Sequence, residues 1–263
     1  MIGFIYDLSY RSDPASYPGS ADRLRSQTDD LVRRADLIVA VSESVRREIL
    51  KAYDFPSDRI HVVYPGVDRE FSPAAEPYRH PKPYFLSVGA VKPGKKLPDA
   101  IRAFGQFIES SGRDFDFLIA GGDYWPDPAV GRTIRDLGLG ARVKLLGHVS
   151  RQLLPNYYRG AVALICASGN EGFCLPAAEA MASGTPVVAV RSGALAETIG
   201  DGGIFAEPGD TDGLADALVK IAASPLLRRK LSSQGIVRSK RYSWRAFARG
   251  VFNLYADHQA AGN

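Results

Sequence analysis

Two glutamates, Glu171 and Glu179, lie in the densest cluster of chemistry-bearing residues in the chain. The cluster follows a predicted strand and opens a predicted helix, with Pro176 in the first turn, where its missing N–H costs nothing. Free N–H groups at such a helix start attract a phosphate or a diphosphate. Glu171 precedes the helix and Glu179 lies about one turn inside it, so both could accept hydrogen bonds from ligand hydroxyls. The alternative is that Glu171 caps the helix and Glu179 faces water.

A basic loop over 92–96 is a second candidate site. It follows an apolar run that ends just before Gly89, and Lys95 within it could act as a point charge on a phosphate. The alternative is a solvated turn in a lysine-rich loop.

Short apolar runs alternate with longer amphipathic stretches along almost the whole chain. The runs predict strands over 2–6, 37–41, 61–64, 84–88, 115–120, 143–146, 162–166, 186–190 and 203–205. The stretches predict helices over 21–34, 44–52, 97–109, 130–137, 151–159, 175–182, 194–199, 211–223, 226–234 and 244–256. This alternation favours the α/β class, a Rossmann-like doubly wound parallel sheet with a partial N-terminal α/β segment.

A proline-rich segment divides the chain. Pro77, Pro81 and Pro83 cannot all lie in a central strand or a helix interior, so 66–83 is predicted to be a linker. Residues 84–240 supply six strands and their helices, enough for a complete nucleotide-binding domain. Residues 1–65 supply three strands, and 241–263 form a C-terminal helix expected to pack back on that segment.

Composition narrows the function classes. The chain has 263 residues, a formal charge of +4 and two cysteines, too few for a disulfide framework or an unaided zinc site. The low cysteine count makes a reducing cytoplasm the expected location. No apolar run approaches the roughly 18 residues of a membrane span. No G-x-G-x-x-G follows a predicted strand, which disfavours a dinucleotide oxidoreductase. The basic stretch 225–255 lacks acidic residues and is expected to be a solvated face or an anionic-lipid patch rather than a nucleic-acid site.

The segment from Glu171 to Glu179, with Gly-Phe-x-Leu-Pro between them, resembles the E-x7-E signature of the retaining family 4 glycosyltransferases, which have the GT-B fold. Further blocks resemble the same family in order and spacing. They lie at 41–44, 60–68, 86–89 with Lys95 and Lys96, 184–188, 193–197 and 242–244, so the resemblance covers nearly the whole chain.

The resemblance implies roles for individual residues. Glu179 would bind the ribose of a nucleotide sugar, Glu171 would contact hydroxyls of the transferred sugar, and Lys95 would stabilise the departing diphosphate. The remaining donor-side positions implied by the family are Gly89, Phe173, Cys174, Leu175, Gly121, His148 and Val149. The glycines among them are equally explained by tight strand exits.

Three positions depart from the family pattern. Tyr6, beside Asp7 on the acceptor side, replaces a histidine, and tyrosine is a poor base near pH 7. Cys174 replaces a glycine of the signature loop. The usual arginine of the diphosphate loop is absent, and Lys92 or Lys96 would substitute without its bidentate fork.

The resemblance implies retaining transfer from a nucleotide-diphosphate sugar, with GDP-mannose favoured weakly, to a glycan or lipid-linked acceptor. The resemblance implies neither a metal nor another cofactor. Family members carry roughly a hundred more N-terminal residues, so the chain is expected to need a missing or separate N-terminal-half subunit, or to form a homo-oligomer. The alternative is a non-catalytic sugar-nucleotide-binding subunit or scaffold. The expected location is cytoplasmic, with possible contact at the inner face of the membrane.

Overall fold

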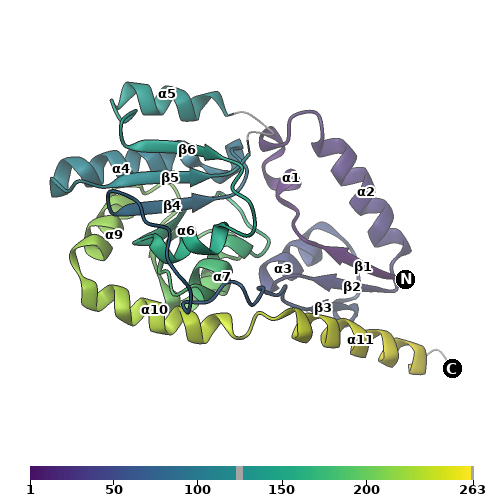
Figure 1. Cartoon of the computed structure of the whole chain (residues 1–263). Helices are drawn as coiled ribbons and strands as arrows, with labels where there is room; N and C mark the ends of the chain where they lie inside the picture. The colour runs from purple at the N-terminus through teal and green to yellow at the C-terminus, as the bar shows by residue number, and fades with distance from the viewer. Residues whose placement is uncertain (123–126, 262–263) are drawn as a thin grey trace.

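The computed structural model describes residues 1–122 and 127–261, which form two α/β lobes, each built on its own parallel sheet (Figure 1). The last two residues of the predicted C-terminal region, 262–263, lie outside the described part. No helix that is described is both long and apolar enough to cross a membrane.

The small lobe contains a three-stranded parallel sheet in the order β1-β2-β3. Phe4 and Val39 lie side by side in the register and face one side of the sheet, while Ile5 and Ala40 face the other and join the core beneath α2 and α3. The elements are β1 (Ile2–Ile5), α1 (Ser9–Ser12), α2 (Ala21–Arg34), β2 (Leu37–Ala40), α3 (Glu43–Ala52) and β3 (Ile60–Val62).

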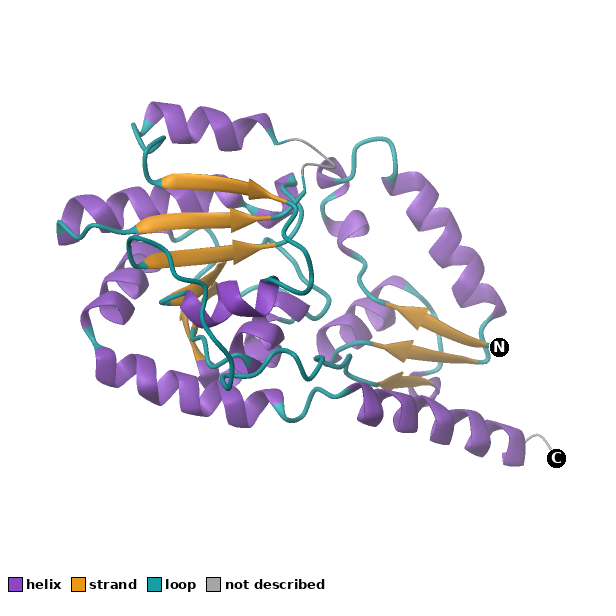
Figure 2. Cartoon of the chain, viewed as in Figure 1, coloured by secondary structure: helices purple, strands orange, loops and turns teal. Residues whose placement is uncertain are grey.

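The large lobe contains a six-stranded parallel sheet in the order β6-β5-β4-β7-β8-β9 (Figure 2). Its strands are β4 (Tyr84–Val88), β5 (Asp116–Ala120), β6 (Val143–Gly147), β7 (Ala163–Cys166), β8 (Val187–Val190) and β9 (Gly203–Ala206). Its helices are α4 (Leu97–Ser111), α5 (Pro128–Asp136), α6 (Leu154–Gly160), α7 (Leu175–Ala182), α8 (Leu195–Ile199), α9 (Thr211–Ala223) and α10 (Pro225–Ser239). The chain adds strands on one side of β4 and then, from β7, on the other.

Both faces of the large sheet are buried, as continuous apolar strands require. Phe85 joins the core beneath α4 and α9, whereas its neighbour Leu86 joins the core shared with α7. The sheet is therefore Rossmann-like, and the β4/β7 junction is its switch point, the place where open α/β sheets bind ligands.

The chain crosses between the lobes twice, at one place. The first crossing follows β3, and the second leads from α10 into α11 (Trp244–Ala261). The Val67 amide donates a hydrogen bond to the Tyr242 carbonyl at 3.1 Å. A Cβ at Gly66 would lie 2.1 Å from the Trp244 nitrogen, so only glycine allows this approach.

Helix α11 lies against the small lobe, on the sheet face opposite α2 and α3. The rings of Phe247 and Phe4 are 6.2 Å apart, and Gly250 lies beside Val63. A helix at the end of the sequence therefore covers a sheet at its beginning.

Glu197 of α8 joins the two lobes. Its carboxylate accepts hydrogen bonds from the amides of Glu43, at 2.7 Å, and Ser44, at 3.0 Å, in the first turn of α3. The Tyr64 hydroxyl donates to the same carboxylate at 2.9 Å, and burial together with Glu197 raises the pKa of Tyr64 to about 12, so this donor stays protonated. The negative charge also lies at the positive end of the α3 dipole.

Replacing Glu197 by alanine should lower the free energy of unfolding by about 2 kcal/mol, because two helix-start amides lose their acceptor. Urea unfolding of the purified chain measures the loss. Glu207→Ala is the matched control, since Glu207 is 71% exposed and forms one surface ion pair with Arg191. Equal stability of the two variants would contradict the role of Glu197.

Candidate functional site

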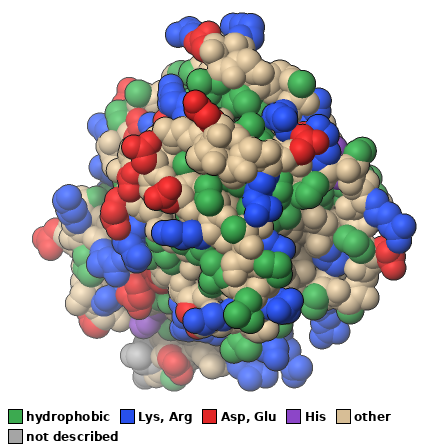
Figure 3. Space-filling view, turned by 90° about the vertical axis from the view of Figure 1, so that its left-hand side faces the viewer, with side chains coloured by type: hydrophobic (Ala, Val, Ile, Leu, Met, Phe, Trp, Pro, Cys, Tyr) green, Lys and Arg blue, Asp and Glu red, His purple; other side chains and the backbone are tan. Residues whose placement is uncertain are grey.

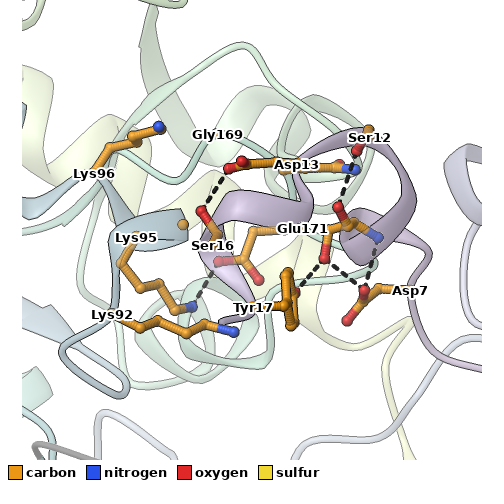
Figure 4. Close-up of a pocket in the computed structure, with 13 residues that line it drawn as sticks. Asp7, Ser12, Asp13, Ser16, Tyr17, Lys92, Lys95, Lys96, Gly169 and Glu171 are labelled. Atoms are coloured by element: carbon orange, nitrogen blue, oxygen red, sulfur yellow. Dashed lines mark hydrogen bonds and ion pairs between the residues drawn. The ribbon is translucent and has the colours of Figure 1, made fainter. Parts of the chain in front are cut away.

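A pocket of about 300 Å³ lies between the lobes, at the carboxyl ends of β4 and β7 (Figure 4). The small lobe contributes Asp7, Ser9, Ser12, Asp13, Ser16 and Tyr17. The large lobe contributes Lys92, Gly94, Lys95, Lys96, Gly169, Asn170 and Glu171. The site is therefore at the switch point, and both lobes form its walls.

Lys95 and Glu171 form an ion pair at the centre of this pocket, with Nζ 2.6 Å from Oε1. The two side chains are 17% and 16% exposed. Burial lowers the pKa of Lys95, but the adjacent Glu171 carboxylate outweighs it, so the net pKa lies above the usual value. Lys95 thus stays positively charged in a poorly solvated place, where Glu171 is its counter-ion and an anion that displaced Glu171 would meet a fixed cation.

The loop that carries Glu171 touches the backbone of the small lobe. A Cβ at Gly172 would lie 1.8 Å from the Tyr6 carbonyl oxygen, so the loop needs glycine here. The Glu171 carbonyl accepts from the Ala194 amide at 2.8 Å. The position of Glu171 therefore depends on the contact between the lobes.

The structure separates the two predicted acceptor-side residues. Asp7 lines the pocket, and its carboxylate accepts hydrogen bonds from the amide of Ser9 at 2.9 Å and from its hydroxyl at 2.6 Å. The Tyr6 side chain is 63% exposed and is not among the residues that line the pocket.

Two of the predicted donor residues point their side chains into the core. The Phe173 ring packs 4.9 Å from that of Tyr242 and is 5% exposed. Cys174 is 6% exposed, and its Sγ lies 4.0 Å from that of Cys166. Contact of Phe173 or Cys174 with a ligand would therefore involve their backbone, whereas Leu175 is 37% exposed.

Cys174 also carries backbone strain. It caps α7 with φ at 69°, in the left-handed region that non-glycine residues rarely adopt. Cys174 replaces the family's glycine at this position but keeps the left-handed backbone conformation that glycine adopts easily.

Glu179 is buried in α7, with the residue 6% exposed. Its carboxylate accepts a hydrogen bond from the Tyr158 hydroxyl at 2.9 Å, and an Arg151 nitrogen lies 3.9 Å away. Burial raises the pKa of Glu179, and the Tyr158 hydrogen bond opposes that shift. A carboxylate buried with so few partners reduces stability and leaves an acceptor available.

A second pocket, of about 240 Å³, brings together Gly89, Gly121, His148 and Val149 at the ends of β4, β5 and β6. A Cβ at Gly121 would lie 1.8 Å from the Gly89 carbonyl oxygen, so the two loops meet backbone to backbone. Gly89 has φ at 133°, and a Cβ there would lie 3.1 Å from Cε of Lys95. Lys95 thus lies between the two pockets.

The small-lobe wall is the part that sequence reasoning missed. Ser12, Asp13, Ser16 and Tyr17 follow Asp7 in or beside two very short helical turns without a motif, α1 and a 3-10 turn over Pro14–Ser16. Asn170, in the large lobe, directly precedes Glu171. The Asn170 side chain donates to Glu48 of α3 at 3.0 Å, a second bond between the lobes. Nowhere in 1–122 or 127–261 do three or more His, Cys, Asp or Glu side chains form a group that could hold a metal ion.

Two lobes with parallel sheets and a pocket between them, lined by charged side chains of both signs, define a two-lobed α/β protein, and comparison with known proteins gives the family. The family model for glycosyl transferases group 1 matches residues 68–238, and that for glycosyltransferase family 4 matches 7–71. The chain belongs to the glycosyl transferases group 1.

Curated relatives agree with this assignment. The O-antigen chain mannosyltransferase B of Escherichia coli is 26% identical over 262 residues, covering 95% of this chain and 68% of that protein. The D-inositol 3-phosphate glycosyltransferase of Corynebacterium glutamicum is 31% identical over 274 residues, covering 97% and 65%. The chain thus spans about two thirds of the length of these relatives.

Solved structures show the GT-B fold. Sucrose-phosphate synthase from Thermosynechococcus elongatus superposes with a TM-score of 0.83 at 23% identity, over 99% of this chain and 68% of that one. Anabaena Alr3699/HepE in complex with UDP and glucose superposes with a TM-score of 0.80 at 19% identity, over 97% and 71%. The predicted fold class is confirmed.

Glu179→Gln should stabilise the unliganded protein at pH 7, because it removes a buried charge and keeps an acceptor for Tyr158. The raised pKa means that the folded chain holds the Glu179 proton more tightly than the unfolded chain does. The wild type therefore loses part of its free energy of unfolding as the pH rises above 4.5, the usual pKa of a glutamate. The Glu179→Gln variant should not show this pH-dependent loss. Urea unfolding at pH 5 and at pH 8 measures the difference. Glu109→Gln, at an exposed position of α4, controls for the loss of one charge.

Gly172→Ala should push the signature loop away from Tyr6, with a cost of about 1–3 kcal/mol in stability and weaker ligand binding. Gly140→Ala is the control, because nothing lies within 4 Å of a Cβ placed there. Thermal unfolding and calorimetry compare the two. A Gly172→Ala protein as stable as the control would refute the close contact.

Proposed function

We propose that the chain is a retaining glycosyltransferase that binds a nucleotide-diphosphate sugar across the cleft. The observation that carries this proposal is the buried Lys95–Glu171 pair between the two lobes, next to the glycine-lined pocket. A cation in a poorly solvated site stabilises a departing diphosphate, and a carboxylate beside it accepts hydrogen bonds from sugar hydroxyls. Family membership supports the same chemistry.

The two pockets suggest how the donor lies. In this proposal the base and ribose occupy the second pocket, where glycines let the backbone approach the flat ring of the base. That pocket is lined by Gly89, Gly121, His148 and Val149. The diphosphate lies at Lys95, and the sugar lies against Glu171. Glu179, whose buried carboxylate has one close donor, receives the ribose hydroxyls.

In the proposed reaction, the bond between the sugar anomeric carbon and the diphosphate oxygen breaks as the acceptor hydroxyl approaches the same face. The departing phosphate oxygen receives the acceptor proton, and the electron pair of the broken bond leaves with the diphosphate. Retention follows because the new bond forms on the face that the diphosphate leaves. Lys95 stabilises the charge of the leaving group, and the rest of the catalysis is positioning.

The acceptor enters from the small-lobe wall that holds Asp7 and Tyr17. We propose a glycan or a lipid-linked acceptor, handled in the cytoplasm at the inner face of the membrane. GDP-mannose is the first donor to test, a choice supported by the mannosyltransferase relative. The relatives are longer, so turnover is tested both with the chain alone and with added N-terminal-half protein.

A thermal-shift screen with GDP-mannose, UDP-glucose, GDP and UDP tests donor binding. A ligand at 100 times its dissociation constant should add about 2.7 kcal/mol of stability, and Glu179→Ala should abolish that gain. Lys95→Ala should lower kcat by roughly 10²–10³-fold. Lys82→Ala is the control, since Lys82 pairs with Asp114 and precedes β4, at the opposite end of the strand from the pocket. No shift with any nucleotide would overturn the proposal.

A further inference from the structure

Helices α10 and α11 run one after the other along the same edge of the molecule, below both lobes (Figure 1). No Asp or Glu occurs between Asp216 and Asp257, a stretch that includes all of α10 and most of α11, and Asp257 lies in the last part of α11. The stretch contains the exposed cations Arg229, Lys230, Lys240, Arg245 and Arg249. Lys and Arg side chains gather along the lower margin of the face in Figure 3.

These five cations have no internal role that would explain them. Within the described residues none of the five forms an ion pair with a carboxylate. By contrast, Arg228 donates to the Ile221 carbonyl at 2.7 Å, and Arg238 donates to the carbonyls of Glu197 and Thr198. The inward arginines hold the helices in place, whereas the charges of the five outward side chains are in contact with solvent.

Large apolar side chains share the outward surface. On α10, Leu226 is 71% exposed and Val237 is 66% exposed; on α11, Trp244, Phe252 and Tyr255 are 45%, 67% and 52% exposed. Phe252 and Tyr255 lie one turn apart on α11. Trp244 lies at the border of the inner stripe, since its ring packs 5.6 Å from that of Phe247, which contacts Phe4. The basic and apolar side chains together are called the α10–α11 face below.

We propose that the α10–α11 face binds the surface of an anionic lipid bilayer. Basic side chains next to exposed Trp, Tyr and Phe are typical of helices that lie in the headgroup region. The helices contain 15 and 18 residues, so together they present roughly 22 and 27 Å of surface. This interaction is independent of the donor site and goes beyond the proposed transfer reaction.

Charge and apolarity together select this partner. A second copy of the chain would bring two predominantly basic faces together, and such faces repel each other. A nucleic acid would match the charge but leave Leu226 and Phe252 in water. A bilayer surface offers phosphates to the cations and an acyl boundary to the apolar side chains.

Co-sedimentation with vesicles of phosphatidylcholine and phosphatidylglycerol tests the proposal on the full chain. The wild type should bind at low salt and be released at high salt, and vesicles of phosphatidylcholine alone should bind it weakly. The double variant Arg245→Gln and Arg249→Gln should bind about thirtyfold more weakly, at roughly fivefold for each cation near the surface. Phe252→Gln should weaken binding at high and low salt alike.

The matched control is the double variant Arg23→Gln and Arg25→Gln, which removes two exposed cations from α2 and should change binding less than about threefold. The proposal would be overturned if both double variants lost binding equally or if the wild type bound no vesicles. It would also be overturned if the chain preferred a DNA duplex, or if it formed a dimer that Phe252→Gln dissociates. The nucleotide thermal shift should persist in Arg245→Gln and Arg249→Gln, so failure here and failure of the donor site are distinguishable.

Discussion

The carboxylate of Glu197 is the interaction on which the site depends. It satisfies two amides at the start of α3, so a helix of the small lobe begins on a side chain of the large lobe. Glu197 lies in α8, three residues after Ala194, whose amide donates to the Glu171 carbonyl. One short segment therefore links the contact between the lobes to the position of the central carboxylate. A pocket with walls from both lobes exists only while this segment stays in place.

Charge burial follows two different patterns in the site. Lys95 and Glu171 compensate each other at 2.6 Å, so their burial leaves a local dipole and little net charge. Glu179 has a neutral donor, Tyr158, and a distant cation in Arg151. The Lys95–Glu171 ion pair fixes the positions of both side chains. The burial of Glu179 lowers stability and leaves its carboxylate free to accept further hydrogen bonds. Binding sites commonly carry such costs, which the remaining fold must offset.

Much of the fold followed from sequence pattern, because apolar periodicity reports burial directly. The bounds of β4 and α7 agree with prediction, and Pro176 lies in the first turn of α7 as expected. Helix α10 extends beyond its predicted end at 234, since Gly235 serves close packing on Met181. A four-residue helix such as α1 has too few residues to show a period.

The family resemblance assigned both Lys95 and Glu171 to the donor site, but it could not show which way a side chain turns. Phe173 faces an aromatic core with Tyr64 and Tyr242, and Tyr6 faces solvent. These orientations depend on residues distant in sequence.

The two crossings between the lobes have a mechanical consequence. Because Gly66 and Val67 lie against Tyr242 and Trp244, both connections leave the large lobe at one point. Paired connections at one point are the arrangement of a hinge, so a change in the width of the cleft would require backbone rotation at these few residues rather than sliding of one lobe along the other.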